Sequence, residues 1–288
     1  MSTRFDRFIA IDWSGARGRW QPGIAVAECG AGDDSPTLVA PPGRAWSRDE
    51  VFDWLTALAA SGSAALIGLD LSPSLPFEDA GAFFPAWARS PRDAKALWAV
   101  VDELAAGEPH FGVSAVVDHD ELRHHFRHLG RLSFTGRGRL RRCEERQRER
   151  PGLSPSSCFN LVGPAQVGKS SLTGMRVLHA LAGRIAVWPF DPVPTSRAVI
   201  VEIYTTIAAL GSGRPPGRAK MRDAASLDAA LRALGCAASG HVGPITDHAT
   251  DAILSAAWLR AQAGNAALWS PEGLDDVATT EGWTFGVP

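Results

Sequence analysis

Acidic residues stand at or near the ends of three apolar segments of this sequence. Asp12 ends FIAID, Asp70 ends LIGLD, and Glu202 lies within VIVEIY. A carboxylate among buried residues is costly unless a partner compensates its charge. If the three acids converge, their oxygens suit Mg²⁺ or Mn²⁺. The alternative for each acid is that it faces solvent or caps a turn.

A fourth acidic group lies on a late segment, DHATDAILSAAWLRAQA (247–263), which has the pattern of a helix. His248 and Asp251 are three residues apart, so their side chains share one helix face. The apolar remainder predicts that the helix docks on a sheet. Asp247 is equally explained as a first-turn acid. The predicted catalytic residues are Asp12, Asp70, Glu202, His248 and Asp251, and all except Glu202 are predicted metal ligands.

Carboxylates that hold divalent ions can support hydrolysis of a phosphodiester bond. Two divalent ions on the carboxylates would activate a water molecule and stabilise the leaving oxygen. His248 would either bind an ion or transfer a proton near neutral pH. The expected cofactor is therefore Mg²⁺ or Mn²⁺.

The segment GPAQVGKS (163–170) matches the phosphate-loop pattern G-x-x-x-x-G-K-[ST]. The preceding CFNLV (158–162) is consistent with a strand, and residues 170–182 with a helix. However, Pro164 lacks an amide that could hold phosphate, and no alternation of strands and helices surrounds the motif. We interpret it as a glycine turn before a helix, which makes a nucleotide-triphosphate site the least favoured function. Lys169 remains a candidate for binding an anion at the helix start.

One segment of the chain is strongly basic. Residues 131–150 contain eight arginines and three glutamates, a net charge of +5, whereas the whole chain carries −2. Basic segments of this kind contact nucleic-acid backbones. The alternative is a solvated helix, because RRCEERQRER mixes charges at helical spacing. The predicted nucleic-acid contacts are Arg137, Arg139, Arg141, Arg142 and Lys169.

The remaining pattern predicts the elements that position these residues. Three strands come first, then a helix that begins with the capping box Ser47-x-x-Glu50, and then a fourth strand. Residues 77–157 form a helical, partly basic insertion. The predicted elements are strands at 7–12, 23–28, 37–40, 65–69, 185–191 and 198–204, helices at 47–60, 91–106, 223–234 and 247–263, and a short final strand in EGWTFGVP. We expect one mixed α/β domain over 1–288.

This order of elements resembles the ribonuclease H-like fold, a mixed sheet flanked by helices. The motif H-x-x-D-A at 248–252 resembles the last helix of the Holliday-junction resolvases, where the matching positions hold metal or catalytic ligands. More narrowly, the chain resembles the family called domain of unknown function 429, which is expected to contain ribonuclease H-like nucleases. The matching segments are FIAIDWSGA, LIGLDLSPSLP, VGKSSLTGMRVLHAL, VWPFD, VIVEIY, DHATDAILSAAWL and EGWTFGVP, and they span residues 8–288. Thr205 departs from that family's proline after E-h-Y.

The composition limits the class of protein and its compartment. The chain has 288 residues, four scattered cysteines, and no apolar run long enough for a signal peptide or a membrane span. We therefore expect a cytoplasmic protein that binds DNA or RNA and no membrane. Two alternatives stay open: an actin-like phosphotransferase or ATPase, which the turn D-W-S-G after Ile11 would suit, and a non-catalytic module that keeps the fold.

Overall fold

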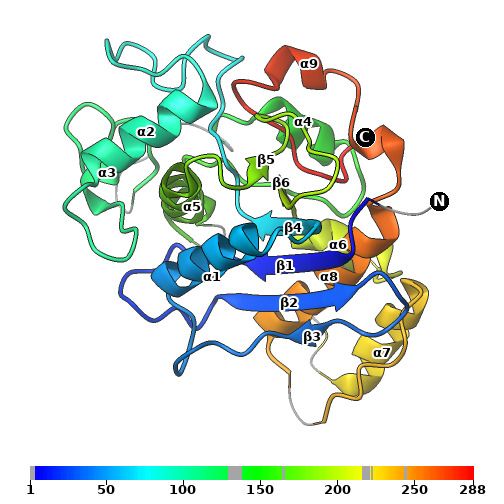
Figure 1. The fold of residues 1–288 in the computed structure, drawn as a ribbon. Coiled ribbons are helices and arrows are strands. Elements are labelled where there is room, and N and C mark those ends of the chain that lie inside the picture. Colours follow the sequence, from blue (N-terminus) through cyan, green and yellow to red (C-terminus); the bar gives the residue numbers. More distant parts are fainter. Residues whose placement is uncertain (1–3, 129–137, 164–165, 216–220, 222, 243–244) are drawn as a thin grey trace.

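A six-stranded mixed sheet organises the computed structural model (Figure 1), which describes residues 4–128, 138–163, 166–215, 221, 223–242 and 245–288. The strand order is β3-β2-β1-β4-β6-β5. β2 is antiparallel to β1 and β3, whereas β1, β4, β6 and β5 run parallel. The carboxyl ends of these four strands therefore meet at one edge. The strands are β1 (Arg7–Asp12), β2 (Ala25–Gly30), β3 (Thr37–Leu38), β4 (Ala65–Asp70), β5 (Ala186–Val187) and β6 (Val199–Glu202).

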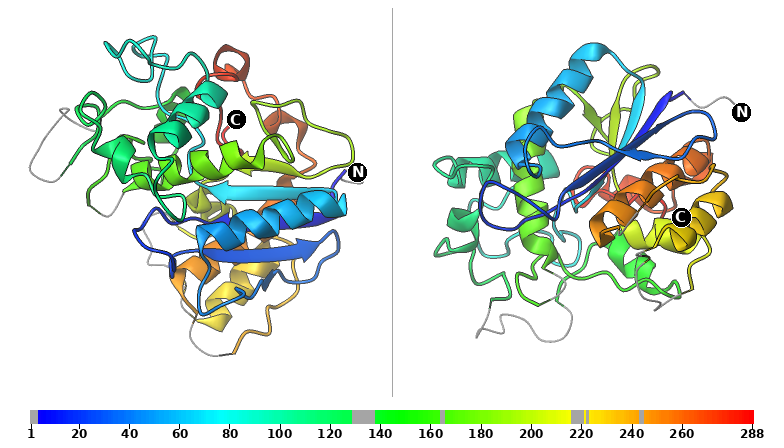
Figure 2. Two further views of the ribbon diagram at one scale, coloured as in Figure 1. Left: turned by 60° about the vertical axis from the view of Figure 1, so that its left-hand side comes forward. Right: turned by 90° about the horizontal axis from the view of Figure 1, so that it is seen from below.

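Helices cover both faces of the sheet, as the right-hand view of Figure 2 shows. Side chains alternate along β1, so Ile9 and Ile11 join one hydrophobic core while Phe8 and Ala10 join the other. The first core includes residues of α1 (Arg48–Ser61), α2 (Ala94–Leu104) and α5 (Val167–Leu181). The second includes residues of α6 (Thr205–Gly211), α7 (Ala224–Ala233) and α8 (Asp247–Gln262).

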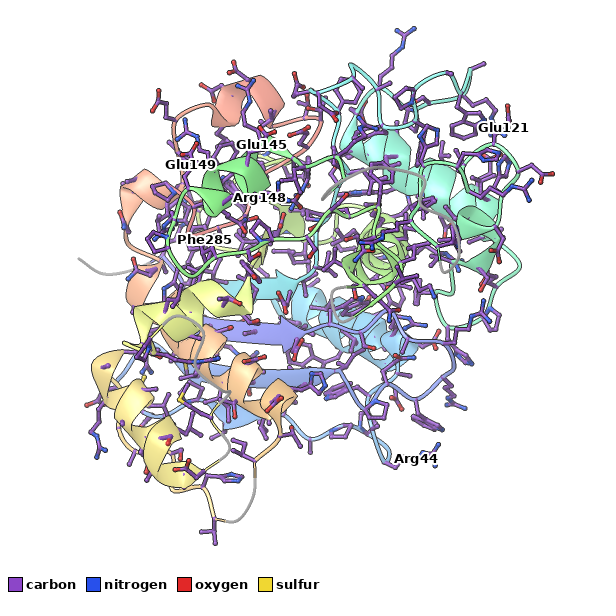
Figure 3. The ribbon with its side chains drawn as sticks, turned by 180° about the vertical axis from the view of Figure 1, so that it is seen from behind. Arg44, Glu121, Glu145, Arg148, Glu149 and Phe285 are labelled. Carbon is purple, nitrogen blue, oxygen red and sulfur yellow. The ribbon has the colours of Figure 1, made fainter. Side chains whose placement is uncertain are left out.

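Short helices complete the described chain. They are α3 (Ser114–Val117), α4 (Arg142–Arg148), the 3-10 helix η1 (Ala266–Leu268) and α9 (Leu274–Val277). The described part of the predicted insertion after β4 contains α2, α3 and α4. Figure 3 shows α4, with Glu145, Arg148 and Glu149, beside the C-terminal segment that carries Phe285. No helix within the described ranges has the length and apolar composition that a membrane crossing needs.

Local sequence signals account for the best-predicted helix. Ser47 accepts a hydrogen bond from the amide of Glu50, and the Glu50 carboxylate accepts one from the Ser47 amide at 2.7 Å. These reciprocal bonds satisfy two backbone donors that a helix start leaves unpaired. The predicted capping box is therefore confirmed, and Glu50 is explained by the fold.

Two predicted strands are wrong. In 158–162, Asn160 forms only an isolated bridge with Arg127, and its carbonyl accepts a hydrogen bond from the amide of Gly168 at 3.1 Å. At the C-terminus, Thr284 forms only an isolated bridge with Glu202, because the chain folds back there. The indole nitrogen of Trp283 donates to the carbonyl of Val287 at 2.9 Å. Short apolar runs do not by themselves distinguish a strand from a tight turn.

Candidate functional site

Asp12 and Asp70 lie side by side at the carboxyl edge of the sheet. They end the parallel strands β1 and β4 and are paired in register. Because side chains alternate along a strand, Asp12 follows Phe8 and Ala10 onto the α8 face, and Asp70 follows Leu66 onto the same face. The sequence prediction that these two acids meet agrees with this register.

His248, in the first turn of α8, contacts the first of these acids. Its Nδ1 lies 2.8 Å from Oδ2 of Asp12. Asp12 is only 7% exposed, whereas the His248 side chain is about half exposed. When the ring is neutral, a carboxylate on Nδ1 favours the tautomer with its proton on Nδ1 and its lone pair on Nε2. The pair therefore presents a histidine of fixed orientation at this edge.

Asp251 lies one helical turn after His248, and it is 8% exposed. Its helix packs on β1 and β2, so Asp251 belongs to the buried side of α8. Across the described parts of the chain, no three acid, histidine or cysteine side chains stand close enough together to hold a metal ion. The structure thus places Asp12, Asp70 and His248 at one edge of the sheet, and Asp251 one helical turn further along α8.

Glu202 belongs to the opposite face. It is in register with Leu69 rather than with Asp70, so its side chain alternates away from the two aspartates. Arg141 donates two hydrogen bonds to the Glu202 carboxylate, from Nη1 to Oε2 at 2.7 Å and from Nη2 to Oε1 at 2.5 Å. The Thr284 hydroxyl donates a third, to Oε1 at 2.8 Å. The predicted convergence of Glu202 with the other acids is therefore not seen, and a buried ion pair compensates its charge instead.

Arg141 is the centre of a buried polar network. Its side chain is completely buried, and its Nε also donates to Glu144 at 3.0 Å. Burial raises the pKa of the Glu144 carboxyl, although Arg141 acts in the opposite direction. Arg141 was predicted to contact nucleic acid, and Glu144 was not among the predicted site residues. The three-residue spacing R-x-x-E was the available signal for their contact.

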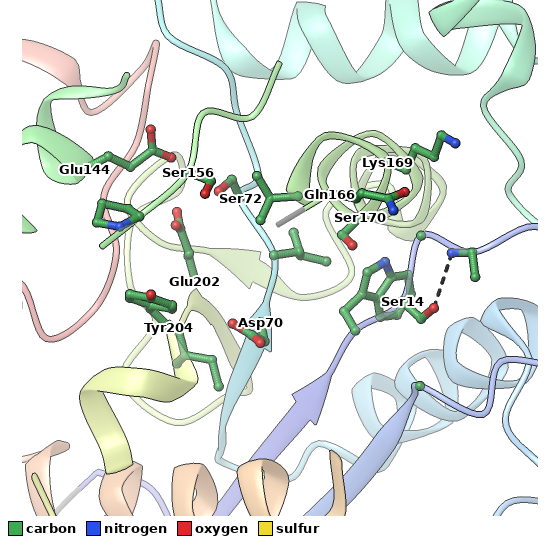
Figure 4. Close-up of a pocket in the computed structure, with 18 of the residues that line it drawn as sticks. Ser14, Asp70, Ser72, Glu144, Ser156, Gln166, Lys169, Ser170, Glu202 and Tyr204 are labelled. Atoms are coloured by element: carbon green, nitrogen blue, oxygen red, sulfur yellow. Dashed lines mark hydrogen bonds between the residues drawn. The ribbon is translucent and has the colours of Figure 1, made fainter. Parts of the chain in front are cut away.

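A cavity of about 750 Å³ lies at the carboxyl edge of the sheet (Figure 4). Asp70, Glu202 and His248 line it, so the two faces meet at its floor. The network of Arg141 and Glu144 forms one wall. The other wall comes from the loop after β1 and the start of α5, whose lining residues include Ser14, Gly15, Gln166, Lys169 and Ser170.

The glycine-lysine motif lies at this second wall. α5 begins at Val167, so Lys169 and Ser170 stand in its first turn, and residues 164–165 lie outside the description. Gly15 lies against this turn so closely that a Cβ there would be 2.3 Å from the Ser170 nitrogen. Lys169 forms no ion pair with any residue that the structure describes. The motif thus brings to the cavity a cation that no described acid pairs with, and residues 158–162 before it form no strand of the sheet.

Most of the predicted basic contacts have internal partners. Arg139 forms two bonds with Asp79, at 2.7 and 2.6 Å, and Arg142 pairs with Asp276 at 3.0 Å. Arg141 is buried, as described above, and Arg137 lies outside the described residues. Only Lys169 among the described candidates lines the cavity and lacks an acidic partner there. Of the predicted contacts that the structure describes, Lys169 is therefore the one whose charge no described acid compensates, and Arg17, which was not predicted, lines the same cavity.

Comparison of the chain with protein-family models, curated proteins and solved structures found no match. The structure itself shows an α/β fold whose six-stranded mixed sheet is flanked by helices. A cavity lies at the carboxyl edge of that sheet.

Proposed function

We propose that this chain is a metal-dependent phosphodiester hydrolase with a ribonuclease H-like fold that acts on nucleic acid. The in-register pair Asp12 and Asp70, with His248 on Asp12 beside the large cavity, carries the proposal. The element order also supports it: three strands, a helix, a fourth strand ending in an acid, and a late helix bearing H-x-x-D. That order underlies the resemblance to the domain of unknown function 429 family.

The donor chemistry at this edge fits a hard divalent cation, Mg²⁺ or Mn²⁺. Asp12 is almost buried, and no lysine or arginine of the described residues pairs with it, so a cation would compensate its charge. Asp12, Asp70 and Asp251 would supply the oxygen ligands, and because no three of the described donor side chains stand close enough together in the structure, they would have to close around the ion. When bound, such an ion polarises a phosphoryl oxygen and lowers the pKa of a bound water molecule.

His248 is suited to move a proton. Asp12 fixes Nδ1, so Nε2 is the nitrogen left to accept a proton in the neutral ring. The ring lines the cavity, where a substrate phosphate would enter. We assign His248 as a proton acceptor, with Asp12 orienting it.

The other cavity walls position the substrate. Arg141 and Glu202 hold each other in a buried pair, so this wall is rigid and presents little free charge. Lys169 faces the cavity from the α5 side without an acidic partner among the described residues. It is placed to attract a backbone phosphate, as a lysine does through its charge.

A cleavage screen tests the proposal. Single-stranded, branched and hybrid nucleic acids would be incubated with the protein and Mg²⁺ or Mn²⁺. We expect cleavage that Asp12→Asn and Asp251→Asn each reduce by about a hundredfold or more, because several kcal/mol of charge stabilisation are lost. Asp53→Asn is the matched control, since Asp53 is exposed on α1.

The same variants separate the alternatives. Unchanged Mn²⁺ affinity in both Asp12→Asn and Asp251→Asn would show that these acids hold no ion. ATP hydrolysis without any cleavage of nucleic acid would favour the actin-like phosphotransferase. Metal binding with neither activity would favour a module that keeps the fold without catalysis.

A further inference from the structure

A second, smaller cavity lies next to the loop that follows β1. Its volume is about 170 Å³. Gly15, Ala16, Arg17 and Lys169 line both cavities, so the two are neighbours that share one wall. The space would hold about six water molecules at their liquid volume, so it has room for one phosphate group together with water.

A buried arginine, Arg48, lines this cavity and not the larger one. Arg48 is 2% exposed, and its guanidinium donates to three backbone carbonyls: Nε to His110 at 2.8 Å, and Nη1 to Ser14 at 3.0 Å and Ala16 at 3.1 Å. Nη2 takes part in none of these bonds, and no carboxylate within the described ranges forms an ion pair with Arg48. Neutral carbonyls hold the group in place but do not neutralise it.

Arg48 is charged at neutral pH despite its burial. Burial lowers its pKa to about 10, and Asp49, which itself bonds to His110, acts in the opposite direction. A buried charge without a counter-ion is costly, and proteins almost always compensate one. An anion in this cavity would therefore stabilise the charge of Arg48.

The other side chains that line the cavity carry a net positive charge. Arg17 and Lys169 add two cationic side chains to Arg48. The opposing charge is Glu108, whose carboxylate accepts hydrogen bonds from backbone amides at the start of α3. Three cations thus face one carboxylate that is already bonded.

One of the three carbonyls that hold Arg48, that of His110, belongs to an unusual piece of backbone. His110 and Phe111 both adopt left-handed conformations, with φ of 56° and 53°. Such conformations are uncommon for residues other than glycine and persist where the surroundings enforce them. The Arg48 guanidinium is therefore fixed rather than free to swing into solvent.

We infer that this smaller cavity binds one phosphate group, with Arg48 and Lys169 as its cationic ligands. The inference rests on the proposed function in assigning that phosphate to the nucleic-acid substrate. Because Lys169 and the loop after β1 line both cavities, the bound phosphate would be a neighbour of the cleaved one along the same strand. The small cavity would thereby set the register of the strand.

Phosphate binding can be measured without any cleavage. Inorganic phosphate would be titrated by calorimetry into the Asp12→Asn protein, and a short single-stranded oligonucleotide would then be tested as a competitor. We expect Lys169→Gln to weaken phosphate binding by about ten- to a hundredfold, the usual effect of losing a charged hydrogen bond. Glu108→Gln should strengthen it by roughly threefold or more, because a like charge leaves the cavity.

These two variants act in opposite directions, which a general loss of folding would not do. Arg184→Gln is the matched control, since Arg184 is an exposed cation beyond the other end of α5. No phosphate binding to the Asp12→Asn protein, or equal binding in all three variants, would overturn the site. Phosphate binding that the oligonucleotide does not displace would overturn its assignment to the substrate. Neither result depends on whether the protein cleaves nucleic acid.

Discussion

At the scale of single residues, the Arg141 side chain is the most constrained charge near the candidate site. It lies between Glu144 and Glu202 and has no exposed surface. Replacing Arg141 by Met would leave two buried carboxylates without their cation. We expect the free energy of unfolding to fall by about 3–5 kcal/mol, measured by urea denaturation. A loss below about 1 kcal/mol would contradict the ion-pair assignment.

Glu144 gives the same network a pH dependence. Because burial raises the folded-state pKa of Glu144, the folded protein binds this proton more tightly than the unfolded chain does. That contribution to stability is complete below the ordinary pKa and is lost as the pH rises through the raised pKa. Glu144→Gln cannot ionise, so its stability relative to wild type should improve over this range by about 1.4 kcal/mol for each unit of pKa elevation.

Urea denaturation of both proteins between pH 4 and pH 8 would measure this difference. Other titrating groups are common to the two proteins and cancel. A difference in the free energy of unfolding that stays constant with pH, or changes in the opposite direction, would show that the pKa of Glu144 is not raised in the folded protein.

The candidate acids show what the sequence can predict about a residue. Asp12 and Asp70 were identifiable because each ends an apolar strand, and parallel neighbours bring such ends together. Glu202 ends its strand in the same way, but it aligns with Leu69. An offset of one residue between strands reverses the face of a side chain, and no local pattern specifies that offset.

At the scale of elements, the loop after β1 and helix α5 depend on one close approach. A Cβ on Gly15 would lie 2.3 Å from the Ser170 nitrogen and 2.4 Å from the Lys169 carbonyl carbon, both backbone atoms. Gly15→Ala must therefore displace the helix start, and we expect a loss of about 1–3 kcal/mol in the free energy of unfolding. Gly107→Ala is the control, since a Cβ there meets nothing within 4 Å. Equal stability of the two variants would contradict the packing.

Element prediction succeeded where local chemistry decides the structure. α1 has its capping box, and α8 was foreseen from its apolar pattern over 247–263, close to its bounds Asp247–Gln262. The segment 158–162 failed because its backbone bonds go to Arg127 and Gly168, partners distant in sequence or in a following turn. Arg48 could not be recognised from the sequence, because its cavity forms only where the loop after β1, α1, residues 108–117 and α5 come together.

At the scale of the whole molecule, the basic segment is held by acids from elsewhere in the chain. Arg139 pairs with Asp79, Arg142 with Asp276, and Arg146 is 3.7 Å from Glu272. Part of the charge of +5 in 131–150 is thus compensated within the protein. Arg142 and Arg146 hold the insertion against the C-terminal segment. We therefore expect nucleic-acid binding to release few counter-ions.

Salt dependence of duplex binding tests this distribution of charge. Eight arginines in contact with phosphates would give a slope of log K against log salt near −7, at about 0.9 for each phosphate. Because Arg139, Arg141, Arg142 and Arg146 are paired with acids, at most four of the eight remain, and we expect a slope no steeper than about −4. Asp276→Asn frees Arg142 and should steepen the slope by about 0.9. Asp275→Asn removes the same charge from a neighbouring residue that pairs with no described cation, and should leave the slope unchanged. A wild-type slope near −7 would return the segment to the role of a phosphate clamp.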